Sequence, residues 1–334
     1  KNIGLLTLLY AETASLLSFK YFINSTTLYL LNDIVKKLKQ RSKSAGYILI
    51  SSKSKSDITS ETLRNGIVVN SENVKPISNH VSKHLKPLND EQLGHYLAGL
   101  IDGDGYFSKI PQLVIAFSSP DAFLAYYLKE KLVYANVKKV KNKNVYLLVV
   151  SKKEGILKVI NLINGKIRLE HRYDQIINYI INNDKYKDIN INFTLNTSND
   201  FSNHWLAGFT DGDGSFQIKI INRTTRVRPE IRLNYQIEHR KDLILKKIKT
   251  FLGGNIGYRK SQDTYYYGST SFGSAKNVIQ YFDEYHLQSR KYLSYLRWRK
   301  VYFLIQNKEH LNDKGLFKIL IIKSLLNKHE DTTI

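Results

Sequence analysis

Apolar and polar positions follow two periods along this chain, and together they predict the same succession of elements twice. Alternation at every second residue predicts strands, whereas apolar positions three or four residues apart predict amphipathic helices. Gly253 and Gly254 mark one helix end, because glycine is common there. The predicted strands fall at 106–110, at 112–117, twice within 137–150, at 215–221, 230–238, 256–260 and 264–270, and the predicted helices begin near Asp121, Glu154, Asp242 and Ser274.

A segment of nearly identical sequence precedes each set of strands. The two copies run from His95 to Phe107 and from His204 to Phe216, at an offset of 109 residues. An offset of this size exceeds a solenoid unit and suits a small domain, so it indicates duplication. The predicted fold class is α+β, with two pseudo-symmetric halves.

Two regions lie outside the repeated pattern. Residues 182–200 are rich in Asn, Asp and Thr, which suits a linker. Residues 1–90 combine apolar helical segments with a Ser- and Lys-rich basic arm at 41–55. Ile3–Phe19 is apolar, but it is too short for a membrane span and Glu12 interrupts it. It is therefore expected to be a buried helix, and a membrane anchor is the alternative. The expected organisation is an N-terminal extension at 1–90, a first domain at 91–195 and a second at 196–334.

Each repeated segment leads into Asp-Gly-Asp-Gly, which places acidic residues at a helix end because glycine favours turns and helix termini. The small residues Ala98, Gly99, Ala207 and Gly208 would let two such helices approach closely and bring their terminal acids together. Close carboxylates repel unless a cation lies between them, and Mg²⁺ prefers oxygen ligands. We therefore expect a metal site that activates water for phosphodiester hydrolysis.

Two structural alternatives exist for the acidic motif. A plain turn would explain one copy, but the same apolar run before both copies argues for function. A calcium-binding EF-hand loop also begins with spaced acids. However, Tyr106 and Ser215 stand where a third ligand is required, and no Glu ends either loop.

The charge balance indicates a polyanionic partner. The chain has 51 Lys and Arg against 29 Asp and Glu, a formal charge of +22. Nucleic acid is the first candidate, and a ribosomal protein or an anionic membrane surface is the alternative. The chain has no Cys, which excludes disulfides, Cys-ligated zinc and thiol catalysis. It also lacks Met and begins with Lys1, so it is expected to be a piece of a longer translation product.

The segments Leu97–Gly105 and Leu206–Gly214 resemble the defining motif of the LAGLIDADG homing endonucleases, and the order of elements in each half extends the resemblance over roughly residues 91–310. The resemblance implies two αββαββα halves with saddle-shaped antiparallel sheets. It leaves residues 1–90 unexplained, and their own apolar segments predict a mainly helical N-terminal extension. It also implies that the two motif helices form the central interface.

The resemblance assigns roles to individual residues. The last acid of each motif, Asp104 and Asp213, is expected to bind the catalytic metals, and the carbonyls of Gly103 and Gly212 to lie near them. Asp102 and Asp211 are expected to shape the turns. A basic residue late in each half would support the hydrolytic water or the phosphate, and the candidates are Lys166, Arg290 and Lys291; a solvated surface position is the alternative for these three.

The sheet of the second half has the chemistry of a base-reading surface. Ile231, Leu233, Tyr235 and Ile237 are expected to face the core, and the polar residues between them to face outward. Arg can bond to guanine, and Asn or Gln to adenine, although an ordinary solvated sheet face remains the alternative. The candidate DNA-binding residues are Gln217, Lys219, Arg226, Arg228, Arg232, Asn234, Gln236, Glu238 and Lys260.

The first half departs from this pattern because only Lys109 to Gln112, including Pro111, separate its first two strands. So short a hairpin implies asymmetric recognition of the target, or a shift of this half toward RNA. The resemblance accordingly carries two functions. One is a homing endonuclease that cuts both strands of a long DNA site with Mg²⁺ or Mn²⁺, and the other is a maturase that assists splicing of a group I intron.

A non-cutting transcription regulator is disfavoured because both motif acids are present. The abundance of Lys, Asn, Ile and Tyr, with 23 Tyr residues, is typical of an AT-rich genome, and with the resemblance it indicates synthesis in the mitochondrial matrix. No transit peptide is visible. The expected partners are double-stranded DNA and group I intron RNA, the expected state is a monomer, and no stable membrane insertion is expected.

Overall fold

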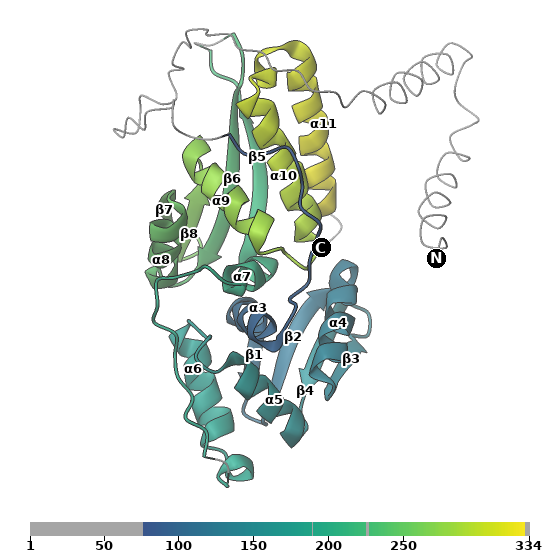
Figure 1. Cartoon of the computed structure of the whole chain (residues 1–334), viewed down its shortest axis with the longest axis vertical. Coiled ribbons are helices and arrows are strands. Elements are labelled where there is room, and N and C mark those ends of the chain that lie inside the picture. Colours follow the sequence, from purple (N-terminus) through teal and green to yellow (C-terminus); the bar gives the residue numbers. More distant parts are fainter. Residues whose placement is uncertain (1–75, 189, 225–226, 331–334) are drawn as a thin grey trace, which may run out of the picture. The chain divides into compact units, whose positions relative to one another are not determined.

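The computed structural model describes residues 76–188, 190–224 and 227–330. All of these residues belong to one compact unit, Lys75–Ile334 (Figure 1). The expected apolar helix at 3–19, the basic arm at 41–55 and the candidate Arg226 lie outside the described residues.

The first half has the predicted αββαββα order. Its sheet is antiparallel with strand order β1-β2-β4-β3, and α4 packs on β2, β3 and β4. The Asn89 side chain caps the motif helix by accepting a hydrogen bond from the backbone N–H of Gln92 at 2.9 Å. The elements are α3 (Asp90–Gly103), β1 (Gly105–Ser108), β2 (Gln112–Ser118), α4 (Ala122–Leu132), β3 (Ala135–Lys139), β4 (Val145–Val150) and α5 (Lys153–Ile163).

The second half repeats this order, which confirms the duplication. Its antiparallel sheet has the order β5-β6-β8-β7. The predicted stop after Leu252 is also confirmed, since Gly253 follows it with a φ of 75°, a conformation that glycine adopts without strain. The elements are α7 (Trp205–Asp213), β5 (Gly214–Ile221), β6 (Glu230–His239), α8 (Leu243–Leu252), β7 (Asn255–Arg259), β8 (Thr264–Ser269) and α9 (Phe272–Glu284).

Further helices lie outside the repeated order, and the sequence patterns did not predict them. The region expected to be a linker contains the short helix η4 and buries Tyr186 and Phe193, so it packs against the core. The additional elements are η2 (Ser119–Asp121), α6 (Glu170–Ile176) with its π-helical continuation η3 (Ile177–Ile181), η4 (Asp184–Tyr186), α10 (Lys291–Gln306), η5 (Glu309–Leu311) and α11 (Asp313–Glu330).

The two motif helices α3 and α7 pack against each other through their glycines (Figure 1). A methyl group added at Gly99 would lie 1.8 Å from the carbonyl oxygen of Trp205, and one added at Gly208 would lie 1.9 Å from that of Tyr96. No side chain fits at either position, so the glycines set the distance between the helices. The predicted close approach through small residues is confirmed.

The two sheets differ in the length of their first hairpin. In the first half, Ser108 pairs with Gln112, so three residues form the turn. In the second half, Ile221 pairs with Glu230, and β5 and β6 extend further than β1 and β2. The short first hairpin predicted from the sequence is thus present.

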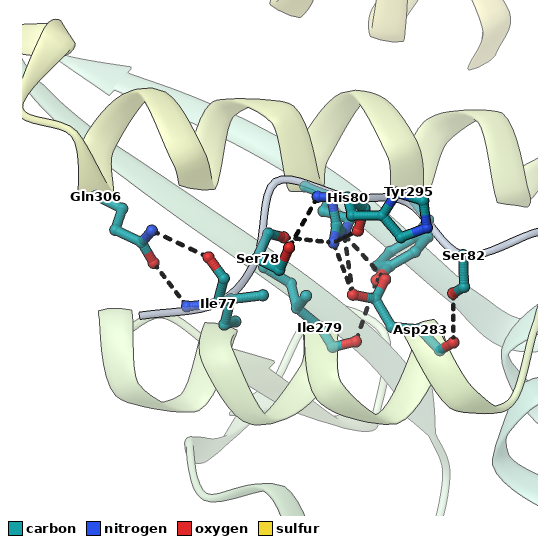
Figure 2. A network of polar contacts seen from close by, with 9 residues as sticks. Ile77, Ser78, His80, Ser82, Ile279, Asp283, Tyr295 and Gln306 are labelled. Carbon is teal, nitrogen blue, oxygen red and sulfur yellow. Dashed lines mark hydrogen bonds and ion pairs between the residues drawn. The ribbon is translucent and has the colours of Figure 1, made fainter. Parts of the chain in front are cut away.

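A strap formed by residues 76–88 lies along the second half before the chain enters α3 (Figure 2). Ile77 exchanges two backbone hydrogen bonds with the side chain of Gln306, at 3.2 and 3.3 Å. The guanidinium of Arg299 donates to the carbonyl oxygens of Ser78 and His80, at 3.0 and 2.9 Å, and also pairs with Asp283. Residues expected to belong to an N-terminal extension therefore contact α9 and α10.

Candidate two-acid site at the ends of the motif helices

Asp104 and Asp213 lie where α3 and α7 end side by side. A methyl group added at Gly212 would lie 3.2 Å from the Cα atom of Gly103 and 3.4 Å from the carboxyl carbon of Asp104. Both Asp104 and Asp213 are exposed, although Asp102 and Asp211, two residues earlier, are buried. The structure therefore brings two solvent-accessible acids together, as the motif predicted.

Both carboxylates are held in a partly desolvated environment. Burial raises the pKa of Asp213 to about 6, and the neighbouring charge of Asp104 acts in the same direction. Burial also raises the pKa of Asp104, with a smaller contribution from Asp121. The C-terminal ends of two helices add partial negative charge at this place. The result is a concentrated negative site on a basic chain, which favours cations.

Two basic side chains compensate part of this negative charge. Lys291 Nζ donates to the carbonyl oxygens of Thr210, at 3.2 Å, and Gly212. Arg172 donates to the matching carbonyl oxygens of the other helix, Ile101 at 3.1 Å and Gly103 at 3.3 Å. Both cations lower the pKa values of Asp104 and Asp213. The site is therefore pseudo-symmetric in its cations as well as its acids.

The inner aspartates Asp102 and Asp211 fasten the two halves to each other. Trp205 Nε1 donates to Asp102 Oδ2 at 2.9 Å, and the Tyr96 hydroxyl donates to Asp211 Oδ2 at 2.7 Å, so each bond crosses from one half to the other.

Each inner carboxylate also accepts backbone N–H groups of the segment that follows the last helix of its own half, including those of Arg168 and Gln288. Burial raises the pKa of Asp102 to about 7. Asp102 and Asp211 are thus structural groups, and they leave the outer pair exposed.

The donor set fits a hard divalent cation. Asp104 and Asp213 supply two carboxylates, and Gly103 and Gly212 supply carbonyl oxygens whose partners are the side chains of Arg172 and Lys291. Among the described residues, no group of three or more His, Cys, Asp or Glu side chains is placed to hold a metal ion. A divalent ion would therefore depend on the two aspartates, backbone carbonyls and water.

Lys166 lies at the wrong end of the motif helix for the role expected of it. Its ammonium pairs with Glu91 at 3.1 Å, in the first turn of α3. Asp104 follows the last residue of this helix, about 20 Å away at 1.5 Å per residue. The expectation that Lys166 supports the site is corrected: Arg172, which the sequence did not single out, occupies the position that matches Lys291.

Arg290 reaches the neighbourhood of the site through its backbone. Its N–H donates to Asp121 Oδ1 at 2.8 Å, and the Ser118 hydroxyl donates to the other oxygen of Asp121 at 2.8 Å. Asp121 thereby links the start of α4 in the first half to the start of α10 in the second. The sequence predicted Asp121 only as a helix start, and nothing in its spacing indicated this contact.

The outward face of the second sheet carries a ladder of polar side chains. Asn234 donates to Gln217 at 3.2 Å and to Gln236 at 3.1 Å, and Gln236 donates to Glu238 at 2.6 Å. Arg259 completes the ladder with an ion pair to Glu238 at 2.5 Å. The alternation that turns Leu233, Tyr235 and Ile237 to the core is confirmed, and Ile231 is partly buried against it.

Two members of this ladder are less accessible than outward-facing residues would suggest. Asn234 and Gln236 are only 3% and 5% exposed, because neighbouring polar side chains and the strand across from them cover both amides. Glu238 and Gln217 flank them and are half-buried. Direct contact of Asn234 or Gln236 with a ligand therefore requires the ladder to rearrange.

The remaining candidates for DNA binding occupy the rim of the same sheet. Lys219 and Lys260 are exposed. Arg228 pairs with Asp313 at 3.1 Å, and Arg232 pairs with Glu230 at 2.5 Å. In the described ranges 76–188, 190–224 and 227–330, no helix is long and apolar enough to cross a membrane.

Comparison with known proteins identifies the family. The family model described as LAGLIDADG endonuclease matches residues 206–302. The chain is 54% identical over 324 residues to an uncharacterized cox1 intron-2 protein of Schizosaccharomyces pombe, covering 95% of this chain and 96% of that protein. It is 34% identical to the intron-encoded DNA endonuclease aI3 of Saccharomyces cerevisiae, over 66% of this chain and 65% of that protein.

A second yeast relative, the intron-encoded RNA maturase bI4, is 26% identical over 66% of this chain and 35% of that protein. Among solved structures, meganuclease I-SmaMI bound to uncleavable DNA aligns with a TM-score of 0.59 at 22% identity, covering 73% of this chain and 100% of that one. I-SmaMI bound to uncleaved DNA with calcium ions aligns at 0.55 and 23% identity, covering 73% and 99%. The chain belongs to the LAGLIDADG endonuclease family, among relatives encoded by introns and named both endonucleases and maturases.

Proposed function

We propose that this chain is a site-specific endonuclease that makes a divalent-metal-dependent double-strand break in DNA. The convergence of the exposed aspartates Asp104 and Asp213 at the ends of two packed helices carries the proposal. Two acids related by pseudo-symmetry match the two strands of a duplex, each of which presents one phosphodiester to be cut. Magnesium is the proposed ion, with manganese as a substitute.

The residues of the site would have different roles in the reaction. Asp104 and Asp213 would hold the cations, and a bound divalent ion supplies Lewis-acid activation and lowers the pKa of its water. Arg172 and Lys291 carry positive charge next to both acids, where charge develops on the phosphate. The reciprocal bonds from Tyr96 and Trp205 keep the two helix ends in register.

The polar face of the second sheet supports DNA as the substrate. Its hydrogen-bonding side chains include amide, carboxylate and guanidinium groups, which together distinguish base edges better than a purely basic face does. The structural neighbour I-SmaMI was solved bound to DNA, which supports the same use of the fold here. We place the protein in mitochondria, as a monomer, on the strength of its intron-encoded relatives and its two halves in one chain.

The second candidate function is that of an RNA maturase for the host intron, with or without DNA cleavage. One relative is named an RNA maturase, and the short first hairpin leaves the first half with less reach into a DNA groove. Splicing of purified intron RNA, measured beside cleavage of a plasmid, separates the two functions.

Replacement of both acids tests the endonuclease directly. We expect Asp104→Asn combined with Asp213→Asn to reduce cleavage of a plasmid carrying the uninterrupted exon junction by at least about 100-fold, because the metal loses both carboxylates. Binding to the same duplex in a gel-shift assay should persist. The matched control is Asp188→Asn, an exposed acid paired with Lys153, and it should cut normally. Undiminished cleavage by the double variant would exclude this site.

A further inference from the structure

We propose that the two sheets read DNA by different chemistry: the second sheet by hydrogen bonds, and the first by apolar contact with thymine methyl groups. The proposal rests on the proposed function and refines it. It predicts that one half of the target is specified by its methyl groups and is otherwise tolerant of sequence.

Strand register establishes which positions of the two sheets correspond. Gly105 and Gly214 each begin the first strand of their half, and they pair with Ile115 and Ile237 respectively. These two isoleucines in turn pair with Leu148 and Tyr267 on the next strand. The central positions of the first sheet therefore have counterparts in the second.

The counterparts on the outward faces differ in polarity. Val114 stands where the second half has Gln236, and Ala116 where it has Glu238. On the neighbouring strand, Leu147 and Val149 correspond to Tyr266 and Gly268. The centre of the first sheet thus lacks the amide and carboxylate groups that form the ladder in the second. The other polar groups of this face surround that centre: Gln112, the counterpart of Asn234, and Ser118 lie at the two ends of β2, Ser108 ends β1, and Asn136 and Lys138 lie on the edge strand β3.

The apolar centre of the first sheet reaches the surface. Ala116 is exposed, Leu147 and Val149 are half-buried, and Tyr106 at the same face is 44% exposed. Val114 is 4% exposed and forms the floor beneath them. Contact with a ligand would therefore fall on Ala116, Leu147, Val149 and Tyr106.

The charge around this apolar face favours a nucleic acid over an apolar protein partner. Strand β3 and the turn after it present the exposed lysines Lys138, Lys139, Lys141 and Lys143. Residues 105–118 and 135–150, which span all four strands, contain no Asp or Glu. Lysines at the rim would bind phosphates, and the apolar centre would lie against the base edges between them.

Thymine is the base that such a face distinguishes. In the major groove, the C5-methyl group of thymine is the apolar feature of a base edge, whereas the other positions present hydrogen-bond donors or acceptors. A surface of Ala, Leu and Val gains free energy by covering that methyl group and gains little from the rest. The target half under the first sheet is therefore expected to be rich in thymine.

The experiment removes only the methyl group. The full chain, in calcium so that bound DNA stays intact, selects duplexes from a randomised library, and Gln217→Ala then identifies the half-site under the second sheet by the base preferences that it relaxes. Thymines in each half are next replaced by deoxyuridine, and the dissociation constants are compared by fluorescence anisotropy.

We expect deoxyuridine under the first sheet to raise the dissociation constant about three-fold per contacted methyl group, and deoxyuridine under the second sheet to change it much less. Leu147→Ala removes contact area but adds no polar group. It should reduce the effect of deoxyuridine under the first sheet and leave the base preferences that depend on Gln217 unchanged.

Equal deoxyuridine effects in both halves, or none in the first, overturn the inference while the endonuclease proposal stands. Equally strong selection of non-thymine bases in both halves also overturns it. Failure to select any duplex overturns the inference together with the proposed function.

Discussion

A cation beside each of the two exposed acids is the least expected residue-level feature of this site. Arg172 and Lys291 bind matching carbonyl oxygens of the two motif helices and lower the pKa values of Asp104 and Asp213. Their charges oppose the burial that raises those pKa values, and thereby favour the ionised form that a metal ion requires. This balance gives the cations a positioning role that can be measured.

We expect Arg172→Ala and Lys291→Ala each to lower the single-turnover cleavage rate by about 10- to 100-fold, since each removes a positive charge next to the scissile phosphates. Loss of either cation also raises the pKa values of the acids. The rise of the cleavage rate with pH should therefore move to higher pH, because the carboxylates ionise later.

Lys166→Ala is the matched control for these two variants. Its ammonium pairs with Glu91 at the far end of α3, so both rate and pH profile should stay unchanged. An unshifted profile for Arg172→Ala would show that the arginine serves structure alone.

Repetition in the sequence was sufficient to find the acids but not their basic partners. The motif offset of 109 residues identifies Asp104 and Asp213 at once. Longer strands in the second half then change the offset, so that Leu148 corresponds to Tyr267, 119 residues later. Arg172 and Lys291 are also 119 residues apart. The motif offset of 109 would pair Lys291 with Asn182, so its counterpart Arg172 is identified only once the strands are paired.

At the scale of elements, the interface between α3 and α7 sets the distance between the acids. Gly208→Ala would place a methyl group 1.9 Å from the Tyr96 carbonyl oxygen, and backbone atoms there cannot yield without separating the helices. We expect a loss of at least about 2 kcal/mol in the free energy of unfolding, measured by urea denaturation. Cleavage should fall as well, because Asp104 and Asp213 move apart.

Gly273→Ala provides the control for this prediction. Gly273 lies in the first turn of α9, and an added methyl group would meet no atom within 4 Å. Stability should stay the same or rise by about 0.5 kcal/mol, because alanine restricts the unfolded chain. If Gly208→Ala were as harmless as Gly273→Ala, close packing of the motif helices would not define the site.

Helices and strands whose apolar residues recur at a regular spacing could be predicted from the sequence. Helices that bury polar and apolar residues together could not. The strands alternate clearly, and the helices beside them carry apolar residues on one face. Helix α10 was missed because it buries Tyr295, Trp298 and Arg299 together, which blurs any division into polar and apolar faces. The burial of Asn234 and Gln236 was missed for a related reason, since alternation gives the direction of a side chain but not what covers it.

At the scale of the described molecule, the strap depends on one buried cation. Arg299 is 2% exposed and joins Asp283 to the backbone of Ser78 and His80. Figure 2 labels these three partners. We expect Arg299→Met to lower the free energy of unfolding by about 3 kcal/mol, because it leaves Asp283 without its ion-pair partner and two carbonyl groups without their donor. Hydrogen exchange should increase at residues 76–88 more than in α3.

The control is Arg232→Met, which breaks the more exposed ion pair with Glu230. It should lower the free energy of unfolding by less than about 1 kcal/mol. Equal losses for the two variants would mean that the strap contributes nothing beyond an ordinary surface pair. No periodic pattern in residues 76–88 signalled the strap, since its hydrogen bonds use backbone as well as side-chain atoms and join it to residues more than 200 positions away.

That separation determines when the strap can dock during synthesis. The residues of α9 and α10 that bind the strap leave the ribosome roughly 200 residues after it. At ordinary elongation rates this is a delay of about 10–40 s. Until then the strap has no surface to bind, and it stays open to chaperones and proteases. Docking therefore has to wait for the synthesis of α10, and a nascent chain truncated before Gln306 should leave residues 76–88 accessible to proteases.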